Sequence, residues 1–278
     1  MNQTEFNEFF KVHSRNVDNS NSLGFWKLTD EIIETYLLDN MTKRDNVTVV
    51  DFGGGTGRWL LMLDKYFTNS KFIIVDLSAD MMAQAKKKLN AGTYKNNVEL
   101  MASDISAIKE LKDNKADYII STYNPLSFVN DPQLAINEAF RILKWGGRAM
   151  ITVQGYYNAL YSKVNNSLAD HEELNLLFKD KKVQWNPSVP SLWQLAKSDM
   201  EKMFVNSGFK DISSYGIACV TQPQGEDFDP ENSQLGSLSK KLNEDEAFYS
   251  TLLRIELNIG RNPDAVDRGM NIMTLGTK

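Results

Sequence analysis

The chain has 278 residues, of which 42% are hydrophobic and 24% are charged, a composition typical of one globular domain over residues 1–278. Its net charge of −5, without a block of Lys and Arg, argues against a nucleic-acid partner, and the single Cys219 excludes an internal disulfide or a cysteine-rich metal site. Because no apolar run approaches the ~20 residues of a membrane span and the N-terminus lacks a signal-peptide pattern, we expect a cytoplasmic protein without a membrane anchor.

Residues 1–46 combine a polar N-terminal arm with a helix. The arm contains several phenylalanines: Phe6, Phe9, Phe10 and Phe25. Its stretch Ser14–Ser22 is rich in Asn and Ser and predicts a loop. Apolar residues near one face predict a helix over Trp26–Met41. Two interpretations of the arm stay open at this point: a mobile extension, or a lid that folds over a bound ligand.

The stretch 47–58 (VTVVDFGGGTGR) joins a predicted strand to a helix through a glycine-rich turn. The β-branched residues before Asp51 fit a strand that is buried on both faces, and Trp59 begins a helical pattern. The turn contains three alternating glycines: Gly53, Gly55 and Gly57. Glycines let the backbone approach a ligand, and the helix N-terminus presents unpaired N–H groups. The dinucleotide fingerprint G-x-G-x-x-G fails because Arg58 takes the place of its last glycine. A glycine-rich turn without a ligand is the alternative interpretation.

An acidic residue follows the second predicted strand, Lys71–Val75. A carboxylate at this strand end, Asp76, is well placed to accept hydrogen bonds from ribose hydroxyls. The alternative role for Asp76 is a helix cap, but Ser78 is the better cap for the helix predicted over Ala79–Leu89.

The third and fourth predicted strands both lead into polar loops. Val98–Ala102 is followed by Asp104, a position from which a carboxylate can accept a hydrogen bond from an adenine amino group. Ala116–Ser121 leads into the loop 122–128 (TYNPLSF). Because ligands in open α/β sheets bind outside the carboxyl ends of the strands, we expect this loop to border the site.

Strands and helices alternate up to the fifth strand, Arg148–Val153. The helix before it begins at Asp131-Pro132 and is predicted to end at Gly146-Gly147. This order predicts a doubly wound parallel sheet. The aromatic-rich segment 154–197 breaks the alternation, and we expect there a lid or an insertion that binds the acceptor substrate of the reaction. A helical decoration with its own small core is the alternative.

Taken in order, these motifs resemble those of the class I S-adenosylmethionine (SAM)-dependent methyltransferases. The resemblance covers residues 47–214 and a last strand over Met270–Leu275. It rests on VVDFGGGTG at 49–57, VDLSADMM at 75–82, SDI at 103–105, ADYIIS at 116–121, RILKWGGRAMITV at 141–153 and FVNSGF at 204–209. It implies an α/β fold with a Rossmann-like sheet of seven strands, the last one antiparallel, and SAM as cofactor with S-adenosylhomocysteine as product. The loop 122–128 lacks the His-rich pattern of many relatives, and the segment before the last strand is longer than the minimal fold.

The resemblance also implies a set of cofactor-binding residues. Asp51 and the three glycines would surround the methionyl part of SAM, Asp76 matches the ribose-binding acid, and Asp104 with Ile105 matches the adenine-side pair. The complete predicted set is Asp51, Gly53, Gly55, Gly57, Asp76, Leu77, Met81, Asp104, Ile105, Ser121 and Tyr123.

Methyl transfer from a sulfonium is an in-line displacement, to which a protein contributes positioning and the exclusion of water, so we expect no metal. Because histidine is the usual acid–base residue near neutral pH, His171 is the predicted proton acceptor, with Tyr123 and Tyr156 as further catalytic candidates. Tyr123, Phe25 and Trp26 could also favour the sulfonium through cation–π attraction.

The acidic charge and the aromatic insertion favour methyl transfer to an O, N or C atom of a small molecule or short peptide. Methylation of RNA or protein is one alternative, and a non-catalytic, SAM-binding regulatory protein is another. The oligomeric state is left open.

Overall fold

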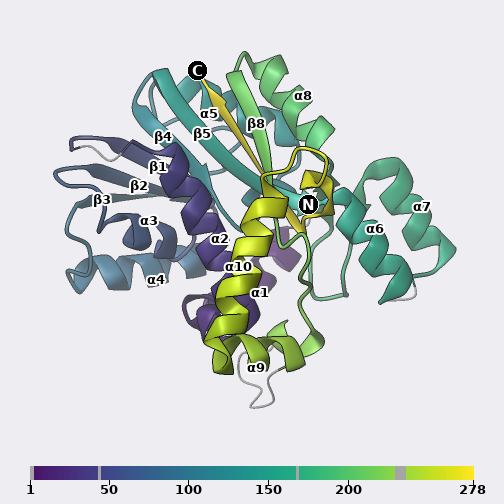
Figure 1. The fold of residues 1–278 in the computed structure, drawn as a ribbon. Coiled ribbons are helices and arrows are strands. Elements are labelled where there is room, and N and C mark those ends of the chain that lie inside the picture. Colours follow the sequence, from purple (N-terminus) through teal and green to yellow (C-terminus); the bar gives the residue numbers. More distant parts are fainter. Residues whose placement is uncertain (1–2, 43–44, 167–168, 229–235) are drawn as a thin grey trace.

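The computed structural model describes residues 3–42, 45–166, 169–228 and 236–278, so residues 43–44 and 167–168 of the predicted arm and insertion lie outside it. The centre of the fold is a mostly parallel sheet (Figure 1). Its main strands are β1 (Thr48–Phe52), β2 (Lys71–Asp76), β3 (Asn97–Ala102), β4 (Ala116–Ser121), β5 (Leu143–Gly155), β8 (Lys210–Ile217) and β9 (Asn271–Thr277). β3, β2, β1, β4 and β5 pair in parallel in that order, and β9 runs antiparallel to both β5 and β8. The predicted arrangement of seven strands with an antiparallel last strand is therefore confirmed, and two short strands of the insertion extend the sheet.

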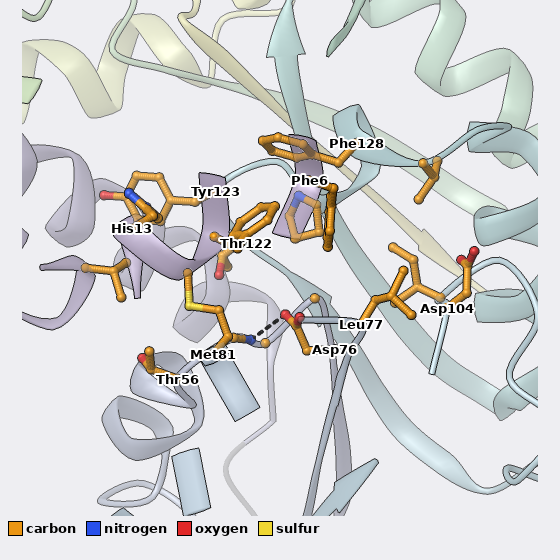
Figure 2. Close-up of a pocket in the computed structure, with 18 of the residues that line it drawn as sticks. Phe6, His13, Thr56, Asp76, Leu77, Met81, Asp104, Thr122, Tyr123 and Phe128 are labelled. Atoms are coloured by element: carbon orange, nitrogen blue, oxygen red, sulfur yellow. Dashed lines mark hydrogen bonds between the residues drawn. The ribbon is translucent and has the colours of Figure 1, made fainter. Parts of the chain in front are cut away.

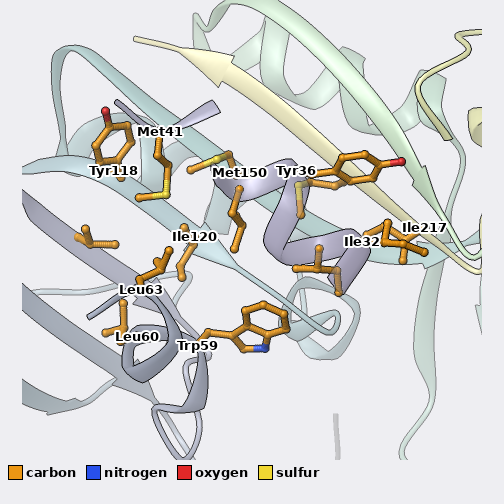
Figure 3. Packing of buried hydrophobic residues seen from close by; sticks show 14 of the residues in the cluster. Ile32, Tyr36, Met41, Trp59, Leu60, Leu63, Tyr118, Ile120, Met150 and Ile217 are labelled. Carbon is orange, nitrogen blue, oxygen red and sulfur yellow. The ribbon is translucent and has the colours of Figure 1, made fainter. Parts of the chain in front are cut away.

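Two layers of helices cover the sheet, because successive side chains of each strand point to opposite faces. In β1, Val49 faces one core and Val50 the other. The first core packs against α2 (Gly24–Asn40), α3 (Arg58–Leu63), α4 (Ala79–Asn90), α9 (Ser237–Glu244) and α10 (Glu246–Gly260). Figure 3 shows part of this core, where Ile32 and Tyr36 of α2 lie near Met150 of β5. The second core packs against α5 (Pro132–Ile142) and α8 (Lys197–Ser207).

The starts of α4 and α5 agree with the predicted capping residues, but the end of α5 differs from the predicted helix end. Ser78 caps α4 by accepting from the Met81 N–H at 3.3 Å, and Asp131 caps α5 by accepting from the Gln133 N–H at 2.9 Å. The prediction that Gly146-Gly147 ends α5 is wrong, because α5 ends at Ile142 and both glycines lie within β5. Pairing of β5 with β4 already begins at Leu143 and shifts register before residue 148, so sheet pairing replaces the last helical turn.

The N-terminal arm is helical. It forms α1 (Gln3–His13) and a 3₁₀ helix, η1 (Val17–Ser22), so the loop predicted over Ser14–Ser22 is wrong for most of its length. Asp18 of η1 accepts a hydrogen bond of 2.6 Å from the Thr56 hydroxyl and forms an ion pair of 2.7 Å with Lys88. These contacts hold the arm against the glycine-rich turn and α4, a long-range arrangement that local composition does not reveal.

The insertion forms α6 (Tyr156–Asn165), α7 (His171–Asp180) and the short strands β6 (Lys182–Val183) and β7 (Leu192–Leu195). β7 extends the sheet by pairing in parallel with the end of β5. A small core of its own holds the segment together and consists of Tyr156, Ala159, Leu177 and Ala196. In Figure 1, α6 and α7 project from the side of the sheet away from α3 and α4.

Candidate functional site

A cleft lies at the carboxyl ends of β1, β2, β3 and β4 (Figure 2). The strand ends supply its floor and one wall, and the N-terminal arm supplies another wall through Phe6, Phe10, His13 and Val17. Binding at the carboxyl edge of a parallel sheet is the general rule for this kind of fold. The cleft is therefore the candidate site for ligand binding and catalysis.

The glycine-rich turn after β1 forms the floor of the cleft. Gly53 and Gly55 have φ of 67° and 53°, a left-handed region that disfavours other residues. A Cβ on Gly53 would lie 2.3 Å from the Pro125 ring, so only glycine lets the loop after β4 approach this closely. Gly57, with φ of 77°, begins α3 and would place a Cβ 2.3 Å from the Tyr94 hydroxyl. Gly57 thus shapes the turn without lining the cleft.

Asp76, at the end of β2, is the best-anchored acid in the cleft. Its Oδ2 accepts the Gly55 N–H at 2.9 Å, and its Oδ1 accepts the Ser78 N–H at 2.7 Å. Burial raises the pKa of Asp76 to about 6, although these two backbone N–H groups favour the charged form. A carboxylate offers about four lone-pair sites, so Asp76 retains capacity to accept further hydrogen bonds.

Asp51 lies directly beneath the floor of the cleft. Its side chain is fully buried, and neither of its carboxyl oxygens has a hydrogen-bond partner among the described residues. A Cβ on Gly54 would lie 2.7 Å from its Cγ, so the carboxyl group packs directly against the turn. Burial, and next the charge of Asp76, raise the pKa of Asp51 well above its usual range.

The ends of β2 and β3 form an apolar side of the cleft with an acid at its margin. Leu77 is 41% exposed although it is a large apolar residue, and it faces the cleft together with Ile105 and Met81. Asp104 lies at the same side and accepts the Ser106 N–H at 2.8 Å. This combination suits a flat ring with polar edges.

The loop after β4 places Tyr123 in the cleft by means of an unusual backbone. Tyr123 and Asn124 have φ of 55° and 69°, left-handed values that cost free energy in residues other than glycine. The Tyr123 hydroxyl donates a hydrogen bond to Asp30 of α2, which also forms an ion pair with Arg58. Burial, followed by the Asp30 charge, raises the pKa of Tyr123 well above its usual range, so the phenol remains a donor.

Aromatic rings of the arm pack against the same loop. The Phe128 ring lies 5.1 Å from Phe10, 5.9 Å from Phe9 and 6.4 Å from Phe6, measured between ring centroids. His13 stacks on Phe9 at 5.5 Å and faces the cleft. His13 is exposed as a whole residue, but desolvation on its cleft side, and next the Arg58 charge, lower the pKa of His13, which favours the neutral imidazole at neutral pH.

The structure brings together most of the predicted cofactor-binding residues and separates the others from the cleft. The predicted residues that line the cleft are Gly53, Gly55, Asp76, Leu77, Met81, Asp104, Ile105 and Tyr123. Asp51 and Gly57 do not line the cleft, and Ser121 is buried and donates its hydroxyl to the Phe52 carbonyl at 2.9 Å.

The predicted catalytic residues of the insertion do not reach the cleft. Tyr156 is buried in the core of the insertion, and His171 is an exposed residue at the start of α7. No described residue of 154–197 lines the cleft. Of the predicted cation–π residues, Phe25 is buried in the first core, and Trp26 lies 6.0 Å from the Tyr123 ring without lining the cleft.

Several residues that line the cleft were not in the predicted set of site residues, among them Phe6, Phe10, His13, Arg58, Thr122 and Phe128. Thr122 and Phe128 belong to the loop 122–128 that we expected to border the site, and Phe6 and Phe10 belong to the arm for which a lid was one of the two interpretations. The i, i+4 spacing of Phe6 and Phe10 was the available signal, since it marks one face of a short helix. In the part of the chain that the structure describes, no group of three or more His, Cys, Asp or Glu residues is arranged to hold a metal ion. Over the same residues, no helix is long and apolar enough to cross a membrane.

Comparisons with known proteins agree with this geometry. A family model described as a methyltransferase domain matches residues 49–147. The ubiquinone/menaquinone biosynthesis C-methyltransferase UbiE of Roseobacter denitrificans is 28% identical over 214 residues, which cover 72% of this chain and 80% of that protein. The chloroplastic 2-methyl-6-phytyl-1,4-hydroquinone methyltransferase of Spinacia oleracea is 31% identical over 150 residues, 54% of this chain but only 41% of that protein.

A solved structure shows the same fold over nearly the whole chain. The SAM-dependent methyltransferase of Thermotoga maritima superposes with a TM-score of 0.55 at 17% identity, over 97% of this chain and 98% of that one. The match of the family model, the sheet order and the glycine-rich turn beside Asp76 lead to one assignment. The chain carries a methyltransferase domain, matched over residues 49–147, within the fold of the class I SAM-dependent methyltransferases.

Proposed function

We propose that this protein moves the methyl group of SAM to a small molecule that carries an aromatic or otherwise flat, apolar part. The observation that supports this most directly is the Asp76 carboxylate, which two backbone N–H groups hold at the cleft beside left-handed glycines. Such an arrangement suits a nucleoside with a charged tail.

The residues present fit each part of SAM. Asp76 would accept hydrogen bonds from the ribose hydroxyls, while Leu77 and Ile105 would pack on the adenine ring with Asp104 at its amino edge. The turn Gly53–Gly55 would bind the aminocarboxypropyl tail, with Asp51 beneath it. When bound, SAM supplies an electrophilic methyl group on a sulfonium, so the protein has mainly to orient the acceptor and exclude water.

The remaining wall of the cleft would receive the acceptor. Phe6, Phe10 and Phe128 form an apolar aromatic surface there, which favours a ring over a polar chain. Relatives whose names specify ubiquinone/menaquinone biosynthesis or a hydroquinone substrate support an acceptor of this chemistry. We therefore place a phenol- or hydroquinone-like ring against Phe128.

An O–H or ring C–H acceptor loses a proton when it is methylated, and His13 is the group that we assign to accept it. It faces the cleft, and its lowered pKa keeps the imidazole unprotonated at neutral pH, so that it can accept a proton. We propose His13 rather than His171 because His171 lies on α7, outside the cleft.

A labelling experiment tests this function. The protein would be incubated with methyl-labelled SAM and a cell extract divided into small-molecule, peptide, protein and RNA fractions. We expect label in the small-molecule fraction, reduced by His13→Gln and unaffected by the matched His171→Gln. Label in RNA or protein would contradict the proposed acceptor. Binding of SAM without label in any fraction would favour a regulatory, non-catalytic role.

A further inference from the structure

The insertion 154–197 supplies no described residue to the cleft, yet one of its side chains is bound to a residue that lines it. The indole N–H of Trp193, in β7, donates a hydrogen bond of 2.9 Å to the backbone carbonyl of Val129. Val129 lines the cleft directly after Phe128, the ring on which Phe6 and Phe10 pack (Figure 2). Trp193 thus connects the insertion to the aromatic wall of the cleft.

Trp193 is held rigidly enough to act as an anchor. Its strand, β7, pairs with the end of β5 and with β6, where Lys182 is its partner and places its ammonium group 4.3 Å from the centroid of the indole ring. Both Trp193 and Val129 pack against the second core. Val129 itself has an extended backbone between η2 (Pro125–Phe128) and α5, so no helical turn fixes its position.

The strands β5 and β9 fix the first part of the same loop. The backbone N–H of Asn124 donates to a β5 hydroxyl at 3.0 Å, and its side-chain amide donates to a β9 side chain at 2.8 Å. The Ser127 hydroxyl accepts a backbone N–H of β5 at 3.1 Å. Trp193 then holds Val129, two residues further along the chain. The loop therefore has a part that the sheet anchors and a following part, Phe128 and Val129, whose position depends on the insertion.

From this arrangement we infer that the insertion controls acceptor binding without touching the acceptor, with Trp193 as the positioning residue that fixes Val129 and, through it, the Phe128 wall. This inference rests on the proposed function, because it takes the Phe128 wall as the acceptor side. The acids assigned to the cofactor, Asp76 and Asp104, follow β2 and β3 instead. Loss of the Trp193 hydrogen bond should therefore weaken acceptor binding and leave SAM binding unaltered.

Kinetics of the full chain with methylhydroquinone, a small acceptor of the proposed class, test this expectation. Trp193→Phe removes the N–H and keeps an aromatic ring. We expect the KM for methylhydroquinone to rise about 3- to 10-fold, as for the loss of one hydrogen bond, while kcat and the Kd of SAM change little. The matched control is Trp185→Phe in the same insertion, because Trp185 donates to Gln154 Oε1 at 2.9 Å and this oxygen keeps a second donor, Gln194, at 2.7 Å.

Three kinetic results would overturn the inference: a KM that stays unchanged in Trp193→Phe, an equal rise of KM in Trp185→Phe, or a parallel loss of SAM affinity in Trp193→Phe. Failure of the unaltered protein to bind or methylate methylhydroquinone would instead refute the proposed acceptor.

Hydrogen–deuterium exchange of the ligand-free protein tests the contact without an acceptor. In Trp193→Phe we expect faster exchange of the backbone amides of residues 128–131, while residues 122–127 keep their protection because β5 and β9 still hold them. Trp185→Phe should exchange like the unaltered protein in both segments. Equal exchange of residues 128–131 in all three proteins would show that Trp193 does not position the wall, and would refute the inference whatever the acceptor is.

Discussion

The hydroxyl of Tyr123 donates a hydrogen bond to the carboxylate of Asp30, although the two residues lie 93 positions apart in the chain. This bond joins the loop after β4 to the first long helix, and the ion pair between Asp30 and Arg58 extends it to the start of α3. The loop after β4, α2 and the start of α3 thus share one partly buried polar network, and Tyr123 keeps its left-handed backbone within it.

Removal of the Asp30 charge should destabilise the protein measurably. Asp30→Asn leaves Arg58 without its counter-ion at a site where the two side chains are only 16% and 17% exposed, and we expect a loss of about 1–3 kcal/mol in the free energy of unfolding. The matched control is Asp39→Asn on the same helix, because the Asp39–Arg261 pair is 54% and 43% exposed and should contribute less than about 1 kcal/mol. Denaturant titration of both variants checks this expectation, and equal losses would contradict it.

Asp76→Ala should weaken SAM binding by about 10- to 100-fold, because hydrogen bonds from the ribose hydroxyls to a carboxylate are lost together with the anchor of the Gly55 N–H. Calorimetry or thermal shift with SAM measures the change. The control is Asp80→Ala, an exposed acid on α4 outside the cleft. Affinity for SAM that stays unchanged in Asp76→Ala would remove Asp76 from the ribose site.

The arm formed by α1 and η1 is proposed to act as a cover that slows ligand exchange. Phe10 lines the cleft and packs on Phe128, so Phe10→Ala should accelerate dissociation of S-adenosylhomocysteine by about 3- to 10-fold, as expected for the loss of one aromatic pair. Val12→Ala changes a residue of the same helix that is 67% exposed and should leave the rate unaltered. Stopped-flow displacement measures both rates, and equal rates in the two variants would argue for a purely structural arm.

The sheet could be predicted from the sequence because its signals are local. Strands buried on both faces are short apolar runs with an acid or polar residue at the end, and β4 has the predicted bounds Ala116–Ser121. The proposed cofactor side of the cleft follows from the same signals, since the ends of β2 and β3 each lead into an acid that lines the cleft, Asp76 and Asp104.

The pairing of the arm with the loop 122–128 at the proposed acceptor side could not be predicted, because it depends on contacts between distant segments. Phe10 meets Phe128 only after α1 has folded back across the sheet edge, and no local pattern in the arm specifies that partner. The same reason explains why the position of each histidine relative to the cleft could not be predicted. His171 lies in an aromatic-rich segment that packs on itself, whereas His13 lies in a polar arm and reaches the cleft through the fold.

The buried Asp51 should lower the stability of the ligand-free protein, and the sign of the effect follows from its pKa. Because the folded-state pKa is raised above the ordinary value near 3.9, the unfolded chain loses its proton first as pH increases. Stability is therefore lost progressively from about pH 4 upward, until the folded-state pKa is passed.

In Asp51→Asn this loss is absent, so the ligand-free variant should have nearly the same Tm as the unaltered protein near pH 4 and a higher Tm at pH 7. For a chain of this size, each kcal/mol corresponds to about 2–4 °C. Thermal unfolding at several pH values measures the difference in Tm, which should grow with pH and should shrink when SAM is added at saturating concentration. A Tm difference that is independent of pH would show that Asp51 is already ionised in the ligand-free protein.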